Sequence, residues 1–151
     1  MRILIILGSE SDLPTLEPAR KLLSSFKVPS VVIIASAHRK PKQVMKIAST
    51  AESKYDLIIA AAGMAAHLPG VVASYTTLPV IGIPLESKGL SGFDALYSIV
   101  QMPPGVPVAT VAIGGAKNAA ILAVQILSLK YPKLKTALKA LKHKMEKGVK
   151  I

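Results

Sequence analysis

The sequence predicts an α/β fold built on a doubly wound parallel sheet of about five strands. Five short apolar runs, each rich in Val, Ile or Ala and most followed by Gly, Ser or Pro, recur along the 151 residues: Ile3–Leu7, Val31–Ala35, Leu57–Ala61, Val80–Ile83 and Val108–Ile113. Such runs are typical of strands buried on both faces, as in parallel sheets. Helical patterns fall between them, and this alternation favours a sheet with helices on both sides.

Apolar spacing predicts the helices between and after the strands. One helical stripe follows the first run (Leu16, Ala19, Leu22, Leu23, Phe26) and another follows the second (Val44, Ile47, Ala48, Ala51). Residues 119–129 are apolar almost throughout, which indicates a helix buried in the core or at a subunit interface. Pro132 separates it from a lysine-rich amphipathic helix within residues 131–151, which we expect to pack on the core or on a neighbouring subunit (Leu134, Leu138, Leu141, Met145).

Length and composition predict a single domain over residues 1–151. An apolar content of 51% excludes a disordered chain, and no linker, repeat or low-complexity segment interrupts it. The absence of cysteine excludes disulfides and thiolate chemistry and is consistent with a reducing compartment. The N-terminal segment lacks the features of a secretory signal, and no apolar run reaches the roughly 18–20 residues that span a bilayer. We therefore expect a soluble cytoplasmic protein without a membrane partner.

The net charge of +11 comes largely from the C-terminal segment. Eight of the 16 lysines lie between Lys130 and Lys150. A basic tail of this kind binds polyanions in some proteins, but the arginines and interleaved aromatic residues of a nucleic-acid reader are missing. A solvated helix face is the favoured interpretation, and nucleic acid is not an expected partner.

Chemistry-bearing residues follow the predicted strands. In doubly wound sheets, ligands bind beyond the carboxyl ends of the strands. The segments expected at that edge are Gly8–Asp12, Ser36–Arg39, Ala62–Gly70, Pro84–Leu90 and Gly114–Asn118. Two of the three histidines and one of the three arginines would meet there.

The segment Gly8-Ser9-Glu10-Ser11-Asp12 is a candidate anion site. A glycine allows close backbone approach, two serines offer hydroxyls, and the free N–H groups of a helix start attract anions. It is neither a Walker loop nor a dinucleotide fingerprint. The alternative is that Ser11 or Asp12 caps the following helix.

His38 beside Arg39 is the most specific pair. A neighbouring cation disfavours the imidazolium form, so we expect His38 to accept a proton near neutral pH. Arg39 would hold a phosphate with its forked guanidinium. His67, in an apolar loop, is by itself more often structural than catalytic, and His143 on the lysine face is expected to be solvated.

No metal site is predicted. The chain has only eight carboxylates, no HExxH and no nucleophile elbow. A phosphate cradle, a neutral base and apolar glycine loops together favour proton transfer on a small phosphorylated substrate.

A series of motifs resembles, in order, the PurE family of purine biosynthesis, over roughly residues 2–129. These motifs are GSESD, SAHRKP, AAHLPG, TTLPVIGIP, LSGFDALYSIVQMPPGVPVATVAIG and KNAAILAVQIL. The resemblance implies a three-layer flavodoxin-like (Rossmann-like) domain, assembled as a homo-octamer with active sites between subunits. It also implies a 5-(carboxyamino)imidazole ribonucleotide mutase, an isomerase that moves a carboxylate from the exocyclic nitrogen to C4 through carbon dioxide and uses no cofactor. An ATP-dependent synthetase that makes the carboxyamino substrate would be its functional partner.

The resemblance assigns roles residue by residue. Ser9, Ser11 and Asp12 would hold the phosphate and ribose. Arg39 would pair with the phosphate, and Ser36 would shape that pocket. His38 would shuttle the proton. The site for the imidazole ring and carbon dioxide would be lined by Gly63, Ala65, His67 and Leu68. A closed apolar loop would keep water from the reacting carbon.

Two departures from the family pattern leave an alternative open. Met64 stands where the family usually has glycine, and Gly114–Asn118 is about two residues shorter than in the common bacterial form. The short segment resembles the branch that carboxylates aminoimidazole ribonucleotide directly with CO2, whereas Arg39 and His67 favour the mutase. A more remote hypothesis is a non-catalytic nucleotide-binding module whose tail docks on a polyanion.

Overall fold

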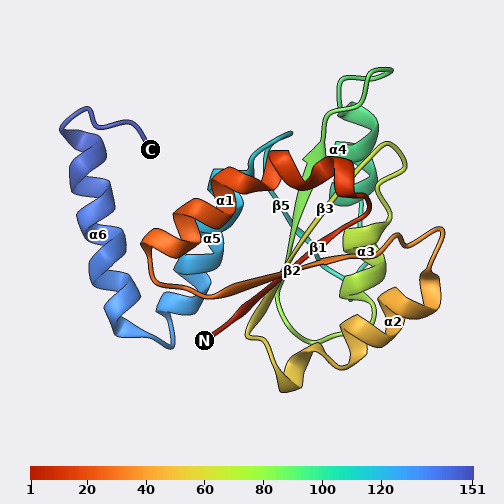
Figure 1. Cartoon of the computed structure of the whole chain (residues 1–151), viewed down its shortest axis with the longest axis horizontal. Coiled ribbons are helices and arrows are strands. Elements are labelled where there is room, and N and C mark those ends of the chain that lie inside the picture. The colour runs from red at the N-terminus through yellow and green to blue at the C-terminus, as the bar shows by residue number, and fades with distance from the viewer.

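A five-stranded, all-parallel sheet forms the centre of the molecule. The computed structural model describes residues 1–151, and Figure 1 shows the sheet between two layers of helices. The strands run in the order β2-β1-β3-β4-β5. Their bounds are Ile3–Leu7 (β1), Ser30–Ile34 (β2), Leu57–Gly63 (β3), Val80–Leu85 (β4) and Ala109–Thr110 (β5). This is the predicted doubly wound arrangement, and the chain reverses its winding direction between β1 and β3.

The central strands are buried on both faces because each supplies apolar side chains alternately to two cores. In β1, Ile3, Ile5 and Leu7 belong to one buried cluster, and Leu4 and Ile6 belong to the other. Successive strand residues point to opposite faces, so a continuous Ile/Leu run is needed to fill both. The prediction of strands buried on both sides is confirmed for β1, β3 and β4.

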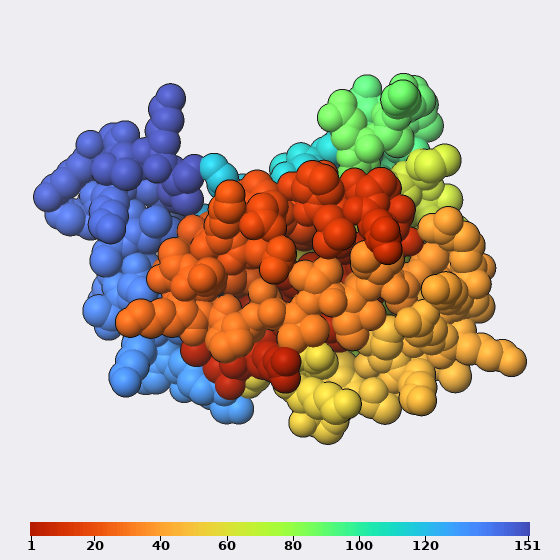
Figure 2. All heavy atoms as spheres, viewed as in Figure 1, coloured from red at the N-terminus to blue at the C-terminus, as the bar shows by residue number.

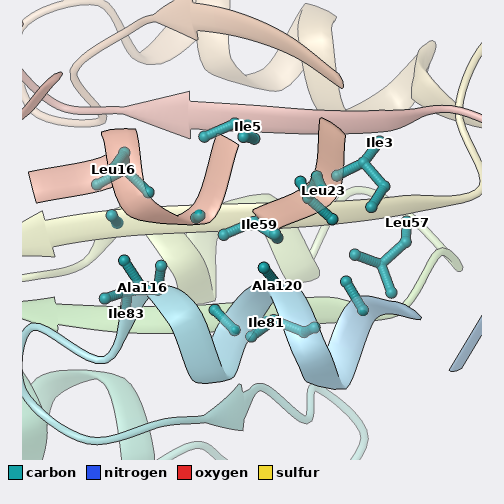
Figure 3. Close-up of a cluster of buried hydrophobic side chains, with 14 of the residues drawn as sticks. Ile3, Ile5, Leu16, Leu23, Leu57, Ile59, Ile81, Ile83, Ala116 and Ala120 are labelled. Atoms are coloured by element: carbon teal, nitrogen blue, oxygen red, sulfur yellow. The ribbon is translucent and has the colours of Figure 1, made fainter. Parts of the chain in front are cut away.

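The first core lies between the sheet and the helices α1 (Leu13–Ser25) and α5 (Ala116–Ser128). Figure 3 shows Leu16 and Leu23 of α1 and Ala116 and Ala120 of α5 around Ile59 of the sheet. Alanines on the inner side of α5 allow the two helices to approach closely. Residues 119–129 were expected to form a helix buried in the core or at a subunit interface; the helix is present up to Ser128 with one side buried in the first core, whereas Gln125 and Leu129 are exposed.

The second core lies under α2 (Pro41–Ser49), α3 (Leu68–Ala73) and α4 (Phe93–Val100). Gly82 in β4 is essential to this packing. A Cβ atom there would lie 2.8 Å from Val108 Cγ1 and closer still to Ile99 Cγ2 of α4. Two short 3-10 turns, Glu10–Asp12 and Ala51–Ser53, lie at the start of α1 and after α2.

Two strands differ from the prediction. The run Val108–Ile113 was expected to be a full strand, but only Ala109 and Thr110 pair with β4. β2 is half-buried along its whole length, not buried on both faces. Both are edge strands with one neighbour, so less of each is covered by helices and less of β5 is held in the ladder.

The last helix, α6 (Pro132–Glu146), begins at Pro132 and packs on α5. Leu134 is its one buried residue, and Leu138 packs partly on the first core. Figures 1 and 2 show α6, in blue, projecting at one side of the molecule with much of its surface uncovered. None of the helices is both long and apolar enough to cross a bilayer.

Candidate active site

An open cleft of about 930 Å³ lies beyond the carboxyl ends of the first four strands. It is lined by residues at the ends of the strands and in the segments that follow them: Gly8, Ser9, Ser11 and Asp12 at β1; Ser36, Ala37, His38 and Arg39 at β2; Ala62, Gly63, Met64, Ala65, His67 and Leu68 at β3; and Leu85, Glu86, Ser87, Lys88, Gly89, Leu90 and Asp94 at β4. The strand order places the reversal point, between β1 and β3, within this group of loops. Ligands of doubly wound sheets bind at such a point.

The first loop places two hydroxyls and one carboxylate in the cleft. Ser9 caps the short Glu10–Asp12 turn: its Oγ accepts from Ser11 N at 3.4 Å and lies 2.9 Å from Ser11 Oγ. Asp12 precedes α1 but makes no side-chain cap bond. Asp12 occupies the N-cap position of α1 with its backbone alone, and the side-chain cap that is present, from Ser9, belongs to the short turn before the helix. The alternative in which the side chain of Ser11 or Asp12 caps α1 is therefore wrong.

Asp12 has an unusual electrostatic environment for a cleft carboxylate. Burial raises the pKa of Asp12 above its ordinary value, and hydrogen bonds from the Ser11 hydroxyl and the Ser9 backbone offset only part of that effect. The Ser11 Oγ to Asp12 Oδ1 distance is 3.4 Å. The carboxylate therefore keeps acceptor capacity that a ligand hydroxyl would fill.

His38 and His67 meet across the cleft. His38 Nε2 and His67 Nδ1 are 2.7 Å apart, and the two rings are edge to face with centroids 4.9 Å apart. One nitrogen donates and the other accepts, so the contact fixes the orientation of both imidazoles. Its position after a predicted strand and the family resemblance both predicted His67 at the ligand edge, and the structure places it, exposed, in the cleft beside His38.

Arg39 joins the second loop to the first. Its Nη2 donates to the carbonyl oxygen of Gly8 at 3.2 Å, and its backbone N–H donates to Ser36 Oγ at 3.3 Å. The guanidinium is exposed and lies at the end of the cleft that holds Ser9 and Ser11. One cation and two hydroxyls at one end are suited to a phosphate group.

The third loop supplies the apolar part of the cleft. Gly63 ends β3 opposite Leu85 of β4, and a Cβ on Gly63 would lie 3.5 Å from the Leu85 carbonyl oxygen. Ala65 and Leu68 also line the cleft, beside His67. Met64 adopts a positive φ of 56°, and its side chain is 68% exposed.

The fourth loop was missed as part of the site, although its position after a strand was recognised. Glu86, Ser87, Lys88 and Leu90 all line the cleft. Ser87 Oγ donates to the Asp94 carboxylate at 3.2 Å. In Figures 1 and 2 this green segment between β4 and α4 stands away from the body of the molecule. The signal available for residues 85–89 was their position alone, because the quoted family motifs end at Pro84 and begin again at Leu90.

The fifth loop does not line the cleft. Gly114–Asn118 was expected at the same edge, yet none of its residues borders the cavity. β5 is the strand farthest from β2 in the sheet order, so its loop lies too far from His38 and Arg39. His143 is 64% exposed on α6, as expected, and lies 3.4 Å from Glu146.

The arrangement combines a polar end, a histidine pair and an apolar wall in one cleft. No group of three or more His, Asp or Glu side chains in the chain is arranged to hold a metal ion. The histidine pair offers a site for proton transfer, and the polar end offers hydroxyls and a guanidinium for an anionic group. The cleft is therefore suited to proton transfer on a phosphorylated small molecule.

Comparisons with known proteins agree with this description. The family model for AIR carboxylase matches residues 2–148. An N5-carboxyaminoimidazole ribonucleotide mutase of Pyrococcus abyssi is 55% identical over 144 residues, covering 95% of this chain and 83% of the relative. A phosphoribosylaminoimidazole carboxylase of Candida glabrata is 56% identical over 126 residues, which cover 83% of this chain but 22% of that larger protein. A crystal structure of Treponema denticola PurE superposes with a TM-score of 0.89 at 29% identity, covering 97% of this chain and 92% of that one.

Proposed function

The chain belongs to the AIR carboxylase family, and we propose that it is an N5-carboxyaminoimidazole ribonucleotide mutase of purine biosynthesis. The observation that carries the proposal is the 2.7 Å contact between His38 and His67 in a cleft that also holds Arg39, Ser9 and Ser11. The resemblance to a mutase covers 95% of this chain and 83% of that relative. The flavodoxin-like fold of this chain is also the fold of Treponema denticola PurE.

The polar end of the cleft would bind the ribonucleotide. Arg39 pairs with the phosphate, with Ser9 and Ser11 donating hydroxyl hydrogen bonds to it. Asp12 accepts from a ribose hydroxyl. Ser36 supports this pocket, because its Oγ accepts a hydrogen bond from the backbone N–H of Arg39.

His38 would move one proton in each half of the reaction. The N–C bond of the carbamate breaks, its electron pair stays on the exocyclic nitrogen, and CO2 leaves as that nitrogen takes a proton from His38. C4 then attacks CO2 with the enamine electron pair and forms the new C–C bond. The C4 proton returns to His38, so atoms and charge balance over the isomerisation.

His67 would orient His38 by the bond between their ring nitrogens. Gly63, Ala65 and Leu68 line the remaining wall, where an uncharged CO2 molecule loses little by leaving water. No cofactor takes part in these steps, since each consists of bond exchange and proton transfer.

Direct carboxylation of aminoimidazole ribonucleotide by CO2 is the second candidate activity. The relative named as a carboxylase, at 56% identity over its aligned segment, favours it. That segment is 22% of the relative, whereas the mutase match covers 83% of its relative. The mutase is therefore preferred.

Supplying both substrates separately tests the proposal. Purified protein is given either the carboxyamino ribonucleotide or aminoimidazole ribonucleotide with bicarbonate, and the C4-carboxylated product is followed. We expect rapid turnover of the first. Rapid turnover of the second alone would replace the mutase by the carboxylase, and turnover of neither would leave the non-catalytic binding module.

We also propose a homo-octamer acting in the cytoplasm. Exposed apolar side chains support assembly: Phe93, Tyr97 and Val100 follow one face of α4 and are 55%, 61% and 50% exposed. A surface of this kind is typical of subunit contacts. Light scattering on the purified protein would give the mass, and a monomer would contradict the assembly. The expected functional pairing with a synthetase is tested by coupled turnover from aminoimidazole ribonucleotide, ATP and bicarbonate.

A further inference from the structure

Met64 adopts a backbone conformation that its side chain does not favour. Its φ of 56° makes it one of three non-glycine residues in the left-handed region. That region is costly for an unbranched apolar residue and free for glycine. A residue retained in such a conformation at a site is a reason to look for a function.

The Met64 side chain is not buried within this chain in a way that would offset the cost of its backbone conformation. It is 68% exposed and belongs to neither buried core. An apolar side chain exposed in a cleft wall becomes favourable when something covers it. The occupant of the cleft is one such cover.

Met64 belongs to the loop after β3 that supplies His67 to the cleft, and not to the first two loops, which supply Ser9 and Arg39. Met64 directly follows Gly63 and precedes Ala65, and His67 contacts His38 at 2.7 Å only three residues later. Leu90, from the neighbouring loop, is a second exposed apolar side chain lining the same cleft, at 62% exposure.

Methionine is suited to a movable apolar cover. It is unbranched, with three rotatable bonds and a polarisable sulfur, so it fits irregular surfaces. An uncharged CO2 molecule has few groups that polar side chains could bind strongly. A flexible apolar side chain next to it is a direct way to exclude water and hinder escape.

We propose that Met64 is a retention residue: its side chain folds over the reacting end of the cleft and keeps CO2 there between loss from nitrogen and capture at carbon. This inference rests on the proposed function. It predicts that shortening the side chain raises the fraction of CO2 that escapes, while the histidines and the phosphate end continue to work.

An isotope-retention experiment tests it. The carboxyamino substrate carries ¹³C in the transferred carboxylate, excess unlabelled bicarbonate and carbonic anhydrase dilute any escaped CO2, and mass spectrometry measures ¹³C in the product. Met64→Leu should retain label like the wild type. Met64→Ala and Met64→Gly should raise the escaped fraction by about tenfold, as expected for removing apolar contacts. Met45→Ala, at an exposed methionine of α2 outside the cleft, is the matched control.

The two short variants separate side chain from backbone. Met64→Gly relieves the positive φ and should melt at the same or a higher temperature than Met64→Ala. If only Met64→Ala loses label, the backbone and not the side chain is responsible, and the proposal is wrong. Wild-type retention in Met64→Ala, or loss in Met64→Leu equal to that in Met64→Ala, also overturns it.

Failure of the proposed function would be seen separately, as a wild type that does not convert the carboxyamino substrate. In that case the same variants are tested with aminoimidazole ribonucleotide and CO2. A KM for CO2 raised about tenfold in Met64→Ala supports the retention role. An unchanged KM, or no turnover with either substrate, overturns it.

Discussion

The charged groups at the amino ends of the strands (the amino edge) and at their carboxyl ends (the ligand edge) have opposite uses. At the amino edge, before β3, Asp56 accepts from the backbone N–H of Arg2 at 2.8 Å and from the Tyr131 hydroxyl at 3.0 Å. At the ligand edge, Asp12 has only the Ser11 hydroxyl, at 3.4 Å, and the backbone of Ser9 beside it, both from its own loop. The first carboxylate is satisfied by its own chain, and the second is left with capacity for a ligand.

The pKa values of these carboxylates shift in opposite directions. Partial burial alone would raise the pKa of Asp56, but the hydrogen bonds from Arg2 and Tyr131 and nearby positive charge together lower it. Hydrogen bonds from Thr77 likewise lower the pKa of Glu52, also at the amino edge. Burial raises the pKa of Asp12. The amino edge therefore stabilises the fold, whereas the ligand edge keeps groups available for chemistry.

Replacing His38 should give the largest functional effect. His38→Asn removes the group that exchanges the proton, so we expect kcat to fall by about 10²- to 10⁴-fold. Ligand binding and melting temperature should change little, because the histidine is exposed and belongs to neither core. Steady-state kinetics, calorimetry and thermal melts measure the three quantities. His143→Asn, on the solvated face of α6, is the control, and near-normal turnover of His38→Asn would show that another group shuttles the proton.

Replacing Arg39 should act on binding more than on turnover. Arg39→Leu removes a charge-assisted contact, and we expect a loss of about 1.5–3 kcal/mol in ligand affinity. Titration calorimetry measures the dissociation constant at fixed salt. Arg20→Leu is the matched control, since Arg20 pairs with Glu17 at 2.9 Å and does not line the cleft. An unchanged affinity in Arg39→Leu would place the phosphate elsewhere.

Replacing Asp56 should act on stability alone. Asp56→Asn keeps an acceptor oxygen but removes the charge, and we expect a loss of about 1 kcal/mol in the free energy of unfolding near neutral pH. Because its pKa is lowered in the folded chain, the contribution is present above the ordinary value of 3.8 and disappears as pH falls through the lowered folded value.

Urea unfolding of Asp56→Asn and wild type at neutral and acid pH measures this difference. Glu10→Gln, which removes an exposed charge, is the control. A difference that persists at pH values well below 3.8 would show that geometry, not charge, is what Asp56 contributes.

Replacing Asp12 should give the smallest effect on stability, with the opposite pH dependence. Its pKa is raised, so the protonated form favours folding below 3.8, and that contribution is lost as pH rises through the folded value. Asp12→Asn should therefore be equal to or slightly more stable than wild type near neutral pH, within about 0.5 kcal/mol. Chemical unfolding measures this, and a marked loss would mean that Asp12 supports the fold as Asp56 does.

The parts of the site that carried local patterns could be predicted from the sequence. The first and second loops were expected in the cleft, and Ser9, His38 and Arg39 line it. Their signals were local: a glycine-serine turn after a buried strand, and adjacent basic groups. His38 and His67 were also expected at the same edge, because each follows a predicted strand, but their direct ring contact had no local signal since 29 residues separate them.

The fourth and fifth loops show the limit of position as a guide. Both follow predicted strands, yet Lys88 and Leu90 line the cleft and Gly114 does not. The difference is the distance of β5 from β2 across the sheet, which strand order sets and chain order does not.

The sequence by itself determined the layered fold, because continuous Ile/Leu runs fill two cores only as parallel strands between helices, and it determined the kinds of chemical group at the ligand edge. Tertiary structure decided which of those groups meet. It brought His67 to His38, left the Asp12 side chain without a cap bond and placed Met64 in the cleft wall. These outcomes depend on strand order and on backbone conformation at the ends of strands, which are set by long-range packing and not by the local pattern of residues.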